Sequence, residues 1–126
     1  MADESLGRVA ERLRRSTVQL VDAGGRGIGS GVLWDAAGTI VTNAHVVRGS
    51  EARAELWDGR RARAQVLARD PRRDLARLRL DAPGLEPAEA GDSSRLRPGE
   101  VVIAIGNPLG FTGALTAGTV YGVGRL

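Results

Sequence analysis

The feature that most constrains this chain is a series of short segments in which apolar and polar residues alternate, with turn residues between them. The segments recur about every ten residues, which is typical of an antiparallel sandwich or barrel. Alternation with a period of two places one face of each strand in a core and the other in solvent. The sequence therefore predicts an all-β fold, with strands at residues 17–21, 27–34, 39–44, 53–57, 61–68, 74–80, 100–106 and 115–123.

Composition agrees with a single globular domain of this kind. The chain has 126 residues, of which 42% are hydrophobic and 26% are charged, and that balance is ordinary for a folded domain. It contains 18 glycines and only 3% aromatic residues. We therefore expect many turns and a core of valine, leucine, isoleucine and alanine.

The first segment, residues 1–15, has a different period and predicts one short helix. Acidic and hydroxyl residues lie where they stabilise the start of a helix, at positions 3–5. Apolar residues then recur at helical spacing. They are Leu6, Val9, Ala10 and Leu13.

Several classes of function are disfavoured by what the chain contains. The chain has no cysteine and a single histidine, which argues against a disulfide framework, a thiolate nucleophile and a zinc site. The net charge is +3, but the arginines alternate along predicted strands, and few aromatics are available to stack on bases. We therefore treat a nucleic-acid-binding barrel as a weak alternative.

The single histidine, His45, admits three interpretations: a structural residue, one ligand of a metal, or a catalytic base. A histidine becomes a general base when a carboxylate accepts its Nδ1–H and leaves Nε2 free to take a proton. Asp58 and Asp70 lie at predicted turns, which they are expected to cap. Asp74 opens an alternating segment at the rim of the fold, but spacing alone leaves its pairing with His45 open.

Four stretches carry a resemblance to a known family. They are "SGVLWDAAGTIVTNAHVV", "LWDGRRARAQVLARDPRRDLARLRLD", "AGDSSRLRPGEVVIAIGNPLG" and "LTAGTVYGVGR". In order and spacing they resemble the HtrA/Deg family of trypsin-like serine proteases, over nearly all of residues 16–126. The most specific parts are "TNAHVV" and "DPRRDLA".

The resemblance implies catalytic roles for two residues. The histidine of the first motif, His45, would be the general base, and the aspartate of the second, Asp74, would orient it. His45 would lie in a short helical turn after a strand, and Asp74 near the start of a later strand. The substrate would be a protein or peptide, with no metal or organic cofactor.

The resemblance also implies a domain organisation. The fold would be an antiparallel six-stranded chymotrypsin-type β-barrel, the first of two. Residues 1–15 would be the N-terminal helix, 16–109 the first barrel, and 110–126 the link and first strand of a second barrel. Family members are often found outside the cytoplasm, but the N-terminal segment lacks the pattern of a secretory signal, so the compartment stays open.

The resemblance places the serine nucleophile in a "GNSGGP"-like loop of the second barrel. We therefore expect no nucleophile in this chain and no proteolysis by the chain alone. The stretch "GDSS" at 91–94 has Arg95 where a trypsin motif needs glycine, so we predict a turn or cap. The stretch "GIGSG" at 27–31 lacks the following helix of a nucleophile elbow, so we predict a strand of closely packed small residues.

One residue departs from the family pattern without affecting the assignment of Asp74, and a second interpretation of the whole chain stays open. Arg77 replaces the aliphatic residue that the family usually has, and its alternation with Arg79 predicts a solvated face. The chain could also be a non-catalytic, truncated protease-like module used in binding or self-association. In that case residues 115–126 would form an unpaired apolar strand that adds to another sheet edge.

Overall fold

The computed structural model describes residues 2–106 and 114–124, which form one helix, eight strands and two short 3₁₀ helices. The helix α1 spans Ala2–Arg15. The strands are β1 (Thr17–Val21), β2 (Gly27–Leu33), β3 (Thr39–Thr42), β4 (Glu51–Glu55), β5 (Arg61–Asp70), β6 (Leu75–Leu80), β7 (Val101–Gly106) and β8 (Ala114–Thr119). The 3₁₀ helices are η1 (Ala44–Val46) and η2 (Ser93–Arg95).

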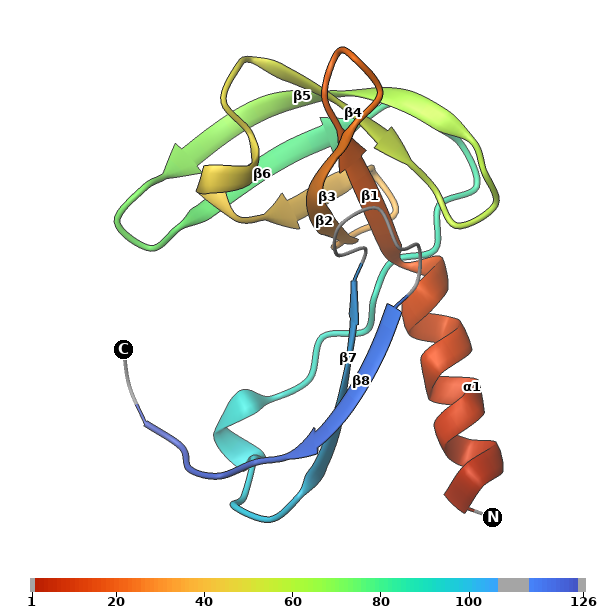
Figure 1. Cartoon of the computed structure of the whole chain (residues 1–126), viewed down its shortest axis with the longest axis vertical. Coiled ribbons are helices and arrows are strands. Elements are labelled where there is room, and N and C mark those ends of the chain that lie inside the picture. The colour runs from red at the N-terminus through yellow and green to blue at the C-terminus, as the bar shows by residue number, and fades with distance from the viewer. Residues whose placement is uncertain (1, 107–113, 125–126) are drawn as a thin grey trace.

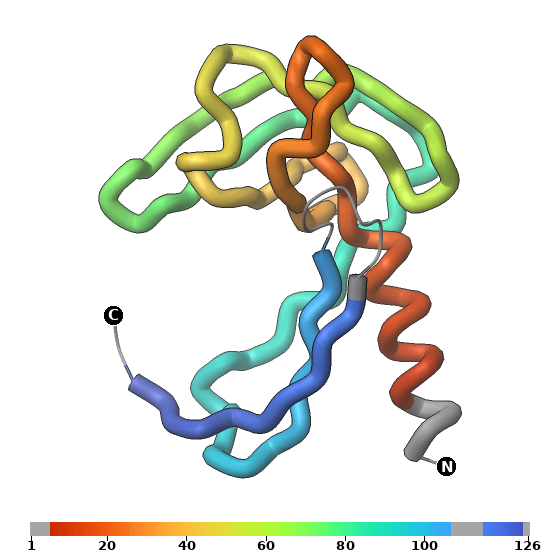
Figure 2. Tube along the Cα trace, in the orientation of Figure 1, coloured from red at the N-terminus to blue at the C-terminus, as the bar shows by residue number. Residues whose placement is uncertain are grey.

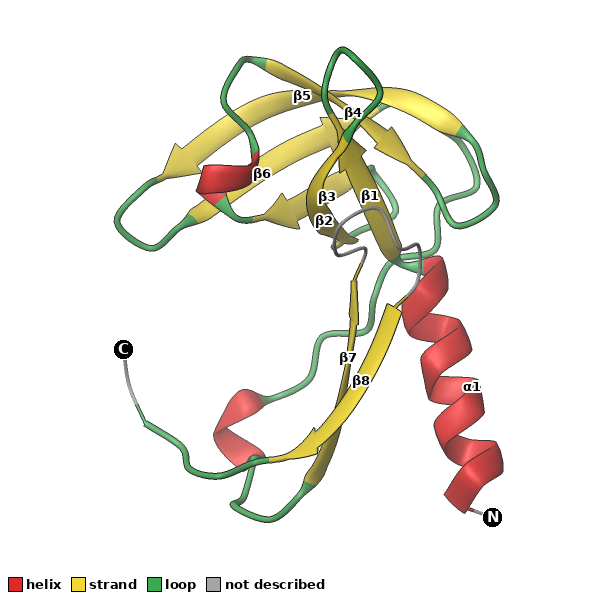
Figure 3. Cartoon of the chain, viewed as in Figure 1, coloured by secondary structure: helices red, strands yellow, loops and turns green. Residues whose placement is uncertain are grey.

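Six of the strands close into a barrel in the order β1-β2-β3-β6-β5-β4, and β4 returns to pair with β1. Every pairing is antiparallel. The barrel forms the upper part of the molecule in Figure 1, and the strands follow one another around it in Figure 3. The predicted all-β fold with a six-stranded antiparallel barrel and a short N-terminal helix is confirmed.

Strand β6 shows how the alternation of the sequence builds the core. Ala76, Leu78 and Leu80 are buried, while the side chains between them face solvent. Arg77 and Arg79 are among the exposed side chains, so the predicted solvated face is confirmed. The remaining core is aliphatic, and its largest fully buried members are Val18, Leu20, Leu33, Ile40, Val47, Leu78 and Leu80.

Strand β2 carries small residues because its neighbours approach it closely. A Cβ on Gly31 would lie 2.6 Å from Cγ2 of Ile40, and one on Gly29 would lie 2.7 Å from both methyl groups of Val46. After Ser30 the chain continues as strand and then turns into β3. The prediction of a strand of closely packed small residues at 27–31 is therefore confirmed.

Strands β7 and β8 form a separate two-stranded sheet outside the closed barrel. They pair in antiparallel register from Val101↔Thr119 to Gly106↔Ala114. Figure 2 shows this ribbon extending away from the barrel, and β7 contacts α1. The expectation of an unpaired terminal strand is wrong for residues 115–119, because β7 supplies the hydrogen-bonding partner.

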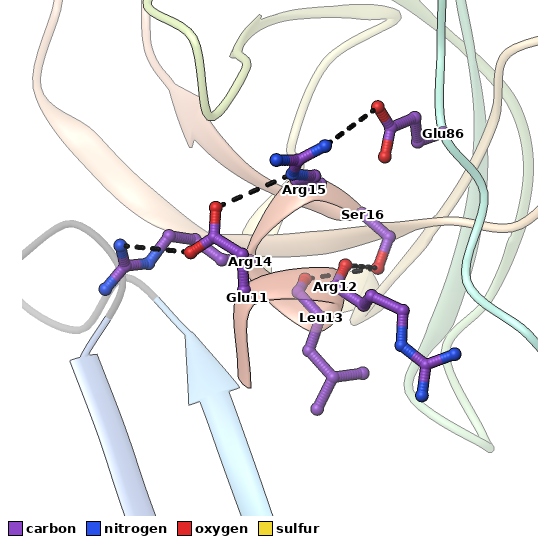
Figure 4. Close-up of polar contacts among 7 residues, drawn as sticks. All are labelled: Glu11, Arg12, Leu13, Arg14, Arg15, Ser16 and Glu86. Carbon is purple, nitrogen blue, oxygen red and sulfur yellow. Dashed lines mark hydrogen bonds and ion pairs between the residues drawn. The ribbon is translucent and has the colours of Figure 1, made fainter. Parts of the chain in front are cut away.

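The end of α1 is attached to the barrel by polar contacts (Figure 4). The carbonyl oxygen of Leu13 accepts hydrogen bonds from the hydroxyls of Ser16, at 3.1 Å, and Thr17, at 2.6 Å. The guanidinium of Arg15 lies 3.6 Å from the carboxylate of Glu86 and 4.9 Å from the ring centre of Trp57. These contacts fix the direction of α1 relative to β1, the strand that follows it.

Candidate catalytic site

His45 is placed by the end of β3. The hydroxyl of Thr42, the last residue of β3, donates to the carbonyl oxygen of Ser30 in β2 at 2.7 Å. The chain then turns through η1, where Ala44 is buried and holds the turn against the barrel. The side chain of His45 is 73% exposed. The predicted position of His45, in a short helical turn after a strand, is confirmed.

Asp74 is placed by the hairpin between β5 and β6. Asp70 and Leu75 pair across the strands, and the loop between them is closed by the backbone N–H of Asp74, which donates to the carbonyl oxygen of Pro71 at 3.3 Å. Asp74 immediately precedes β6, so its predicted position near the start of a strand is confirmed. Its backbone has a φ of 54°, in the left-handed region that few residues other than glycine adopt.

The structure brings the two predicted residues into direct contact. Oδ2 of Asp74 lies 2.7 Å from Nδ1 of His45, and Oδ1 accepts the backbone N–H of His45 at 2.9 Å. Because an ionised carboxylate can only accept hydrogen bonds, Nδ1 carries the hydrogen. The neutral ring then has its lone pair on Nε2, the nitrogen that can take a proton.

The same contacts favour the ionised form of Asp74. The backbone N–H of His45 lowers the pKa of the Asp74 carboxyl most, followed by the imidazole of His45, and the backbone N–H of Ala44 adds to this. A carboxylate held in its charged form can hold an imidazolium beside it when Nε2 takes up a proton.

A third residue, Asn43, joins this pair. Its Nδ2 donates to the backbone carbonyl oxygen of Asp74 at 3.0 Å. Asn43 was not among the residues predicted from the sequence. Its only signal was its place two residues before His45 in the motif "TNAHVV", and nothing in that motif indicates a contact with the hairpin of Asp74.

An open groove lies beside His45 and has a volume of about 750 Å³. Its walls come from the hairpin of β1 and β2, from η1 and the loop after it, and from β4 and β5. The residues that line it include Ile28, Val46, Arg48, Glu51, Arg53 and Arg63. Glu51 and Arg63 are joined by an ion pair at 2.7 Å.

The remaining candidate residues have structural positions. Asp58 accepts the backbone N–H of Arg60 at 3.1 Å, and Asp70 accepts that of Arg73 at 3.3 Å. Asp92 caps η2 by accepting from the backbone N–H of Ser94. The predictions of turn or cap positions for Asp58, Asp70 and the stretch 91–94 are therefore confirmed.

The described part of the chain offers neither a metal-binding cluster nor a helix that could span a membrane. Within residues 2–106 and 114–124, no three histidine, cysteine, aspartate or glutamate side chains are grouped so that they could hold a metal ion. Within the same residues, no helix has the length and apolar character needed to cross a bilayer.

Comparison with known proteins connects this geometry to a family. A family model described as "Trypsin-like peptidase domain" matches residues 29–125. Periplasmic serine endoprotease DegP of Salmonella typhimurium is 44% identical over 101 residues, which cover 78% of this chain and 21% of that protein. Protease Do-like 1 of Arabidopsis thaliana, a chloroplastic protein, is 46% identical over 103 residues, which cover 79% of this chain and 24% of that protein. The chain thus spans less than a quarter of the length of these relatives.

Solved structures of HtrA-type proteases have the same fold. The HtrA-type protease AlgW with a tripeptide superposes with a TM-score of 0.88 at 34% identity, over 95% of this chain and 40% of that one. AlgW with a decapeptide superposes with a TM-score of 0.84 at 27% identity, over 95% and 46% of the two chains. Together with the barrel and with relatives that are HtrA- and DegP-type serine proteases, the family match shows that this chain belongs to the trypsin-like peptidase family.

Proposed function

We propose that this chain supplies the general base and its orienting carboxylate to a serine endopeptidase. The observation that carries the proposal is the contact of 2.7 Å between Nδ1 of His45 and Oδ2 of Asp74, which leaves Nε2 as the proton acceptor. The pair is largely exposed, and exposed ion pairs contribute little to stability. A catalytic role therefore explains this geometry better than a structural one.

The proposed reaction is acyl transfer to serine followed by hydrolysis. The serine oxygen attacks the peptide carbonyl while Nε2 of His45 takes the hydroxyl proton, and a tetrahedral intermediate forms. His45 then gives that proton to the leaving amine as the peptide C–N bond breaks. Water hydrolyses the acyl-enzyme by the same route, and the carboxylate of Asp74 stabilises the imidazolium in both steps.

The serine is proposed to come from a second barrel, for which β7 and β8 provide the connection. In this arrangement residues 1–15 are the helix, 16–109 the first barrel with β7 at its end, and 110–126 the link and first strand of the second barrel. Within that last segment, residues 110–113 and 125–126 lie outside the described residues. On this proposal the chain by itself does not cleave peptides, since it lacks the nucleophile and the oxyanion hole.

Covalent labelling with a fluorophosphonate tests the proposal, because the probe reacts with a serine that a histidine has activated. We expect no labelling of the 126-residue chain and labelling of the native gene product that contains a second barrel. His45→Ala in the longer protein should abolish the signal, whereas Arg72→Ala, an exposed change in the loop beside Asp74, should retain it. Labelling of the short chain, or undiminished labelling of His45→Ala, would overturn the proposal.

A second candidate function rests on a different observation. The ribbon of β7 and β8 exposes apolar side chains, among them Val101 at 70% and Leu115 at 45%, and Tyr121, which follows β8, is 99% exposed. An apolar two-stranded ribbon can add to another sheet edge. A non-catalytic module that associates with itself or with a partner is therefore the alternative, and the fluorophosphonate experiment separates it from the first.

A further inference from the structure

Asp74 holds a backbone conformation that its own residue type disfavours. Among the described residues it is the only one other than glycine with a positive φ, at 54°. In the left-handed region the Cβ of an L-residue approaches the following carbonyl oxygen too closely, although aspartate tolerates this better than most residues. Contacts from outside the loop are therefore needed to hold Asp74 in this one conformation.

Asn43 provides such a contact, and it does so with a side chain that would ordinarily cap the turn η1. It occupies the N-cap position of η1 with an extended backbone (φ −85°, ψ 143°), where an asparagine side chain commonly accepts a hydrogen bond from the turn that follows. Its side chain makes no capping hydrogen bond. Instead Nδ2 reaches across to the hairpin of β5 and β6 and donates to the carbonyl oxygen of Asp74 at 3.0 Å.

We propose that Asn43 is a positioning residue, which orients Asp74 so that one carboxylate meets both the backbone and the ring of His45. The amide of Asn43 fixes the plane of the peptide bond that follows Asp74. With that plane fixed, Oδ1 lies 2.9 Å from the backbone nitrogen of His45 and Oδ2 lies 2.7 Å from Nδ1. Asn43 and His45, two residues apart, therefore hold the main chain and the side chain of Asp74 at three points.

This role differs from simple attachment of two loops. If Asn43 only joined η1 to the hairpin, its loss would lower stability without changing the imidazole. If it positions the carboxylate, its loss lets Asp74 leave Nδ1, and the ring hydrogen then redistributes between the two nitrogens. The catalytic meaning of the contact rests on the proposed function, but the effect on the tautomer of His45 does not.

Nitrogen-15 NMR of the 126-residue chain measures this effect directly. His45 is the only histidine, so the imidazole signals of the labelled chain belong to one residue. In the wild type we expect the neutral ring to carry its hydrogen on Nδ1. In Asn43→Ala the ratio of the Nδ1–H to the Nε2–H tautomer should fall about fivefold, which corresponds to the loss of one ordinary hydrogen bond.

Arg72→Ala is the matched control, because it removes an exposed side chain from the same loop and should leave the tautomer ratio unchanged. A lower melting temperature of Asn43→Ala with an unchanged tautomer ratio would show a merely structural role and overturn the proposal. An equal change of the ratio in Arg72→Ala would overturn it too.

A second measurement needs no variant and keeps the proposal falsifiable if Asn43→Ala does not fold. In the wild-type chain we expect a scalar coupling across the hydrogen bond from Nδ2 of Asn43 to the carbonyl carbon of Asp74. We also expect slow exchange of one hydrogen of that amide. An Asn43 amide that exchanges as fast as a free one, with no coupling, would contradict the proposal. Neither measurement requires a serine nucleophile. The proposed proteolysis can therefore fail while the positioning role of Asn43 stands, and the positioning role can fail while the proteolysis stands.

Discussion

At the scale of single residues, the site depends on how many groups hold one carboxylate. Asp74 accepts from the backbone N–H and the ring of His45, while its own carbonyl oxygen accepts from Asn43. The imidazole is exposed and is oriented mainly by this aspartate. A pair of this kind is suited to moving a proton, since Nε2 remains accessible.

Acid should weaken the fold partly through Asp74. Its folded-state pKa lies below the ordinary value of 3.8, chiefly because it accepts the backbone N–H of His45 and then because of the imidazole. A depressed carboxyl pKa contributes stability that is present above the unfolded pKa and is lost as the pH falls through the folded pKa. The free energy of unfolding in urea should therefore change less between pH 7 and pH 2.5 in Asp74→Asn than in the wild type.

The measurement is a pair of urea titrations at the two pH values for each protein. Arg72→Ala, from the same loop, should show the same change in the free energy of unfolding between the two pH values as the wild type. If Asp74→Asn shows the same difference as the wild type, folding does not lower the pKa of the Asp74 carboxyl.

His45 and Asp74 of the candidate site could be predicted from the sequence, whereas Asn43 could not. Local alternation predicts Asp74 at the start of a strand, whereas the helical turn at His45 is what the family resemblance implies. Spacing leaves the pairing of His45 with Asp74 open, and the resemblance implies it. The left-handed backbone of Asp74 and its contact with Asn43 could not be predicted. They depend on how the β5–β6 hairpin meets η1, and the residues involved are far apart in sequence.

At the scale of elements, two turns show when a glycine is required by its surroundings. Gly38, between β2 and β3, has a φ of +99°, and a Cβ there would overlap the carbonyl oxygen of Leu80. The N–H of Leu80 in turn donates to the carbonyl oxygen of Gly38 at 2.7 Å. Gly59 has a similar φ of +88°, but a Cβ there would meet nothing within 4 Å.

Alanine at these two positions should therefore have unequal effects. Gly59→Ala adds only backbone strain and should lower the free energy of unfolding by about 1 kcal/mol. Gly38→Ala adds an overlap with backbone that cannot move easily, so its cost should be about 3 kcal/mol. Urea denaturation of both variants measures the difference, and equal costs would show that the β2–β3 turn does not pack against β6 as described.

Most strands could be predicted from alternation and turn residues, and the structure has strands in all eight predicted ranges. The pairing of β7 with β8 outside the barrel was not predicted. Alternation tells which face of a strand is buried, but it carries no information on which neighbour the strand pairs with. The bounds also shifted at some ends; for example, β8 ends at Thr119 rather than continuing to residue 123.

At the scale of the whole molecule, the barrel is complete and the β7–β8 ribbon is not enclosed. The barrel buries its aliphatic core on all sides, whereas the ribbon leaves Val101 70% exposed. On the proposed function a second barrel covers the ribbon. In the 126-residue chain we expect the ribbon to associate with a second copy.

Sedimentation velocity over a range of concentrations tests this association. The wild-type chain should shift toward a dimer or larger species as concentration rises, because exposed apolar surface favours burial. Val101→Glu, which places a charge on the ribbon, should weaken the shift, while Leu67→Glu, a similar change on the exposed face of β5, should not. A strictly monomeric chain at high concentration would contradict the prediction.

The central claim, that His45 is the base of a serine endopeptidase and Asp74 orients it, is tested most directly by turnover at saturating peptide. The protein to use is the longer protein that the proposed function requires, in which a serine-bearing second barrel follows this sequence. His45→Ala and Asp74→Asn should each lower kcat by about 10⁴-fold, since each removes a member of the catalytic unit. Retention of kcat within tenfold of the wild type in either variant would contradict the account.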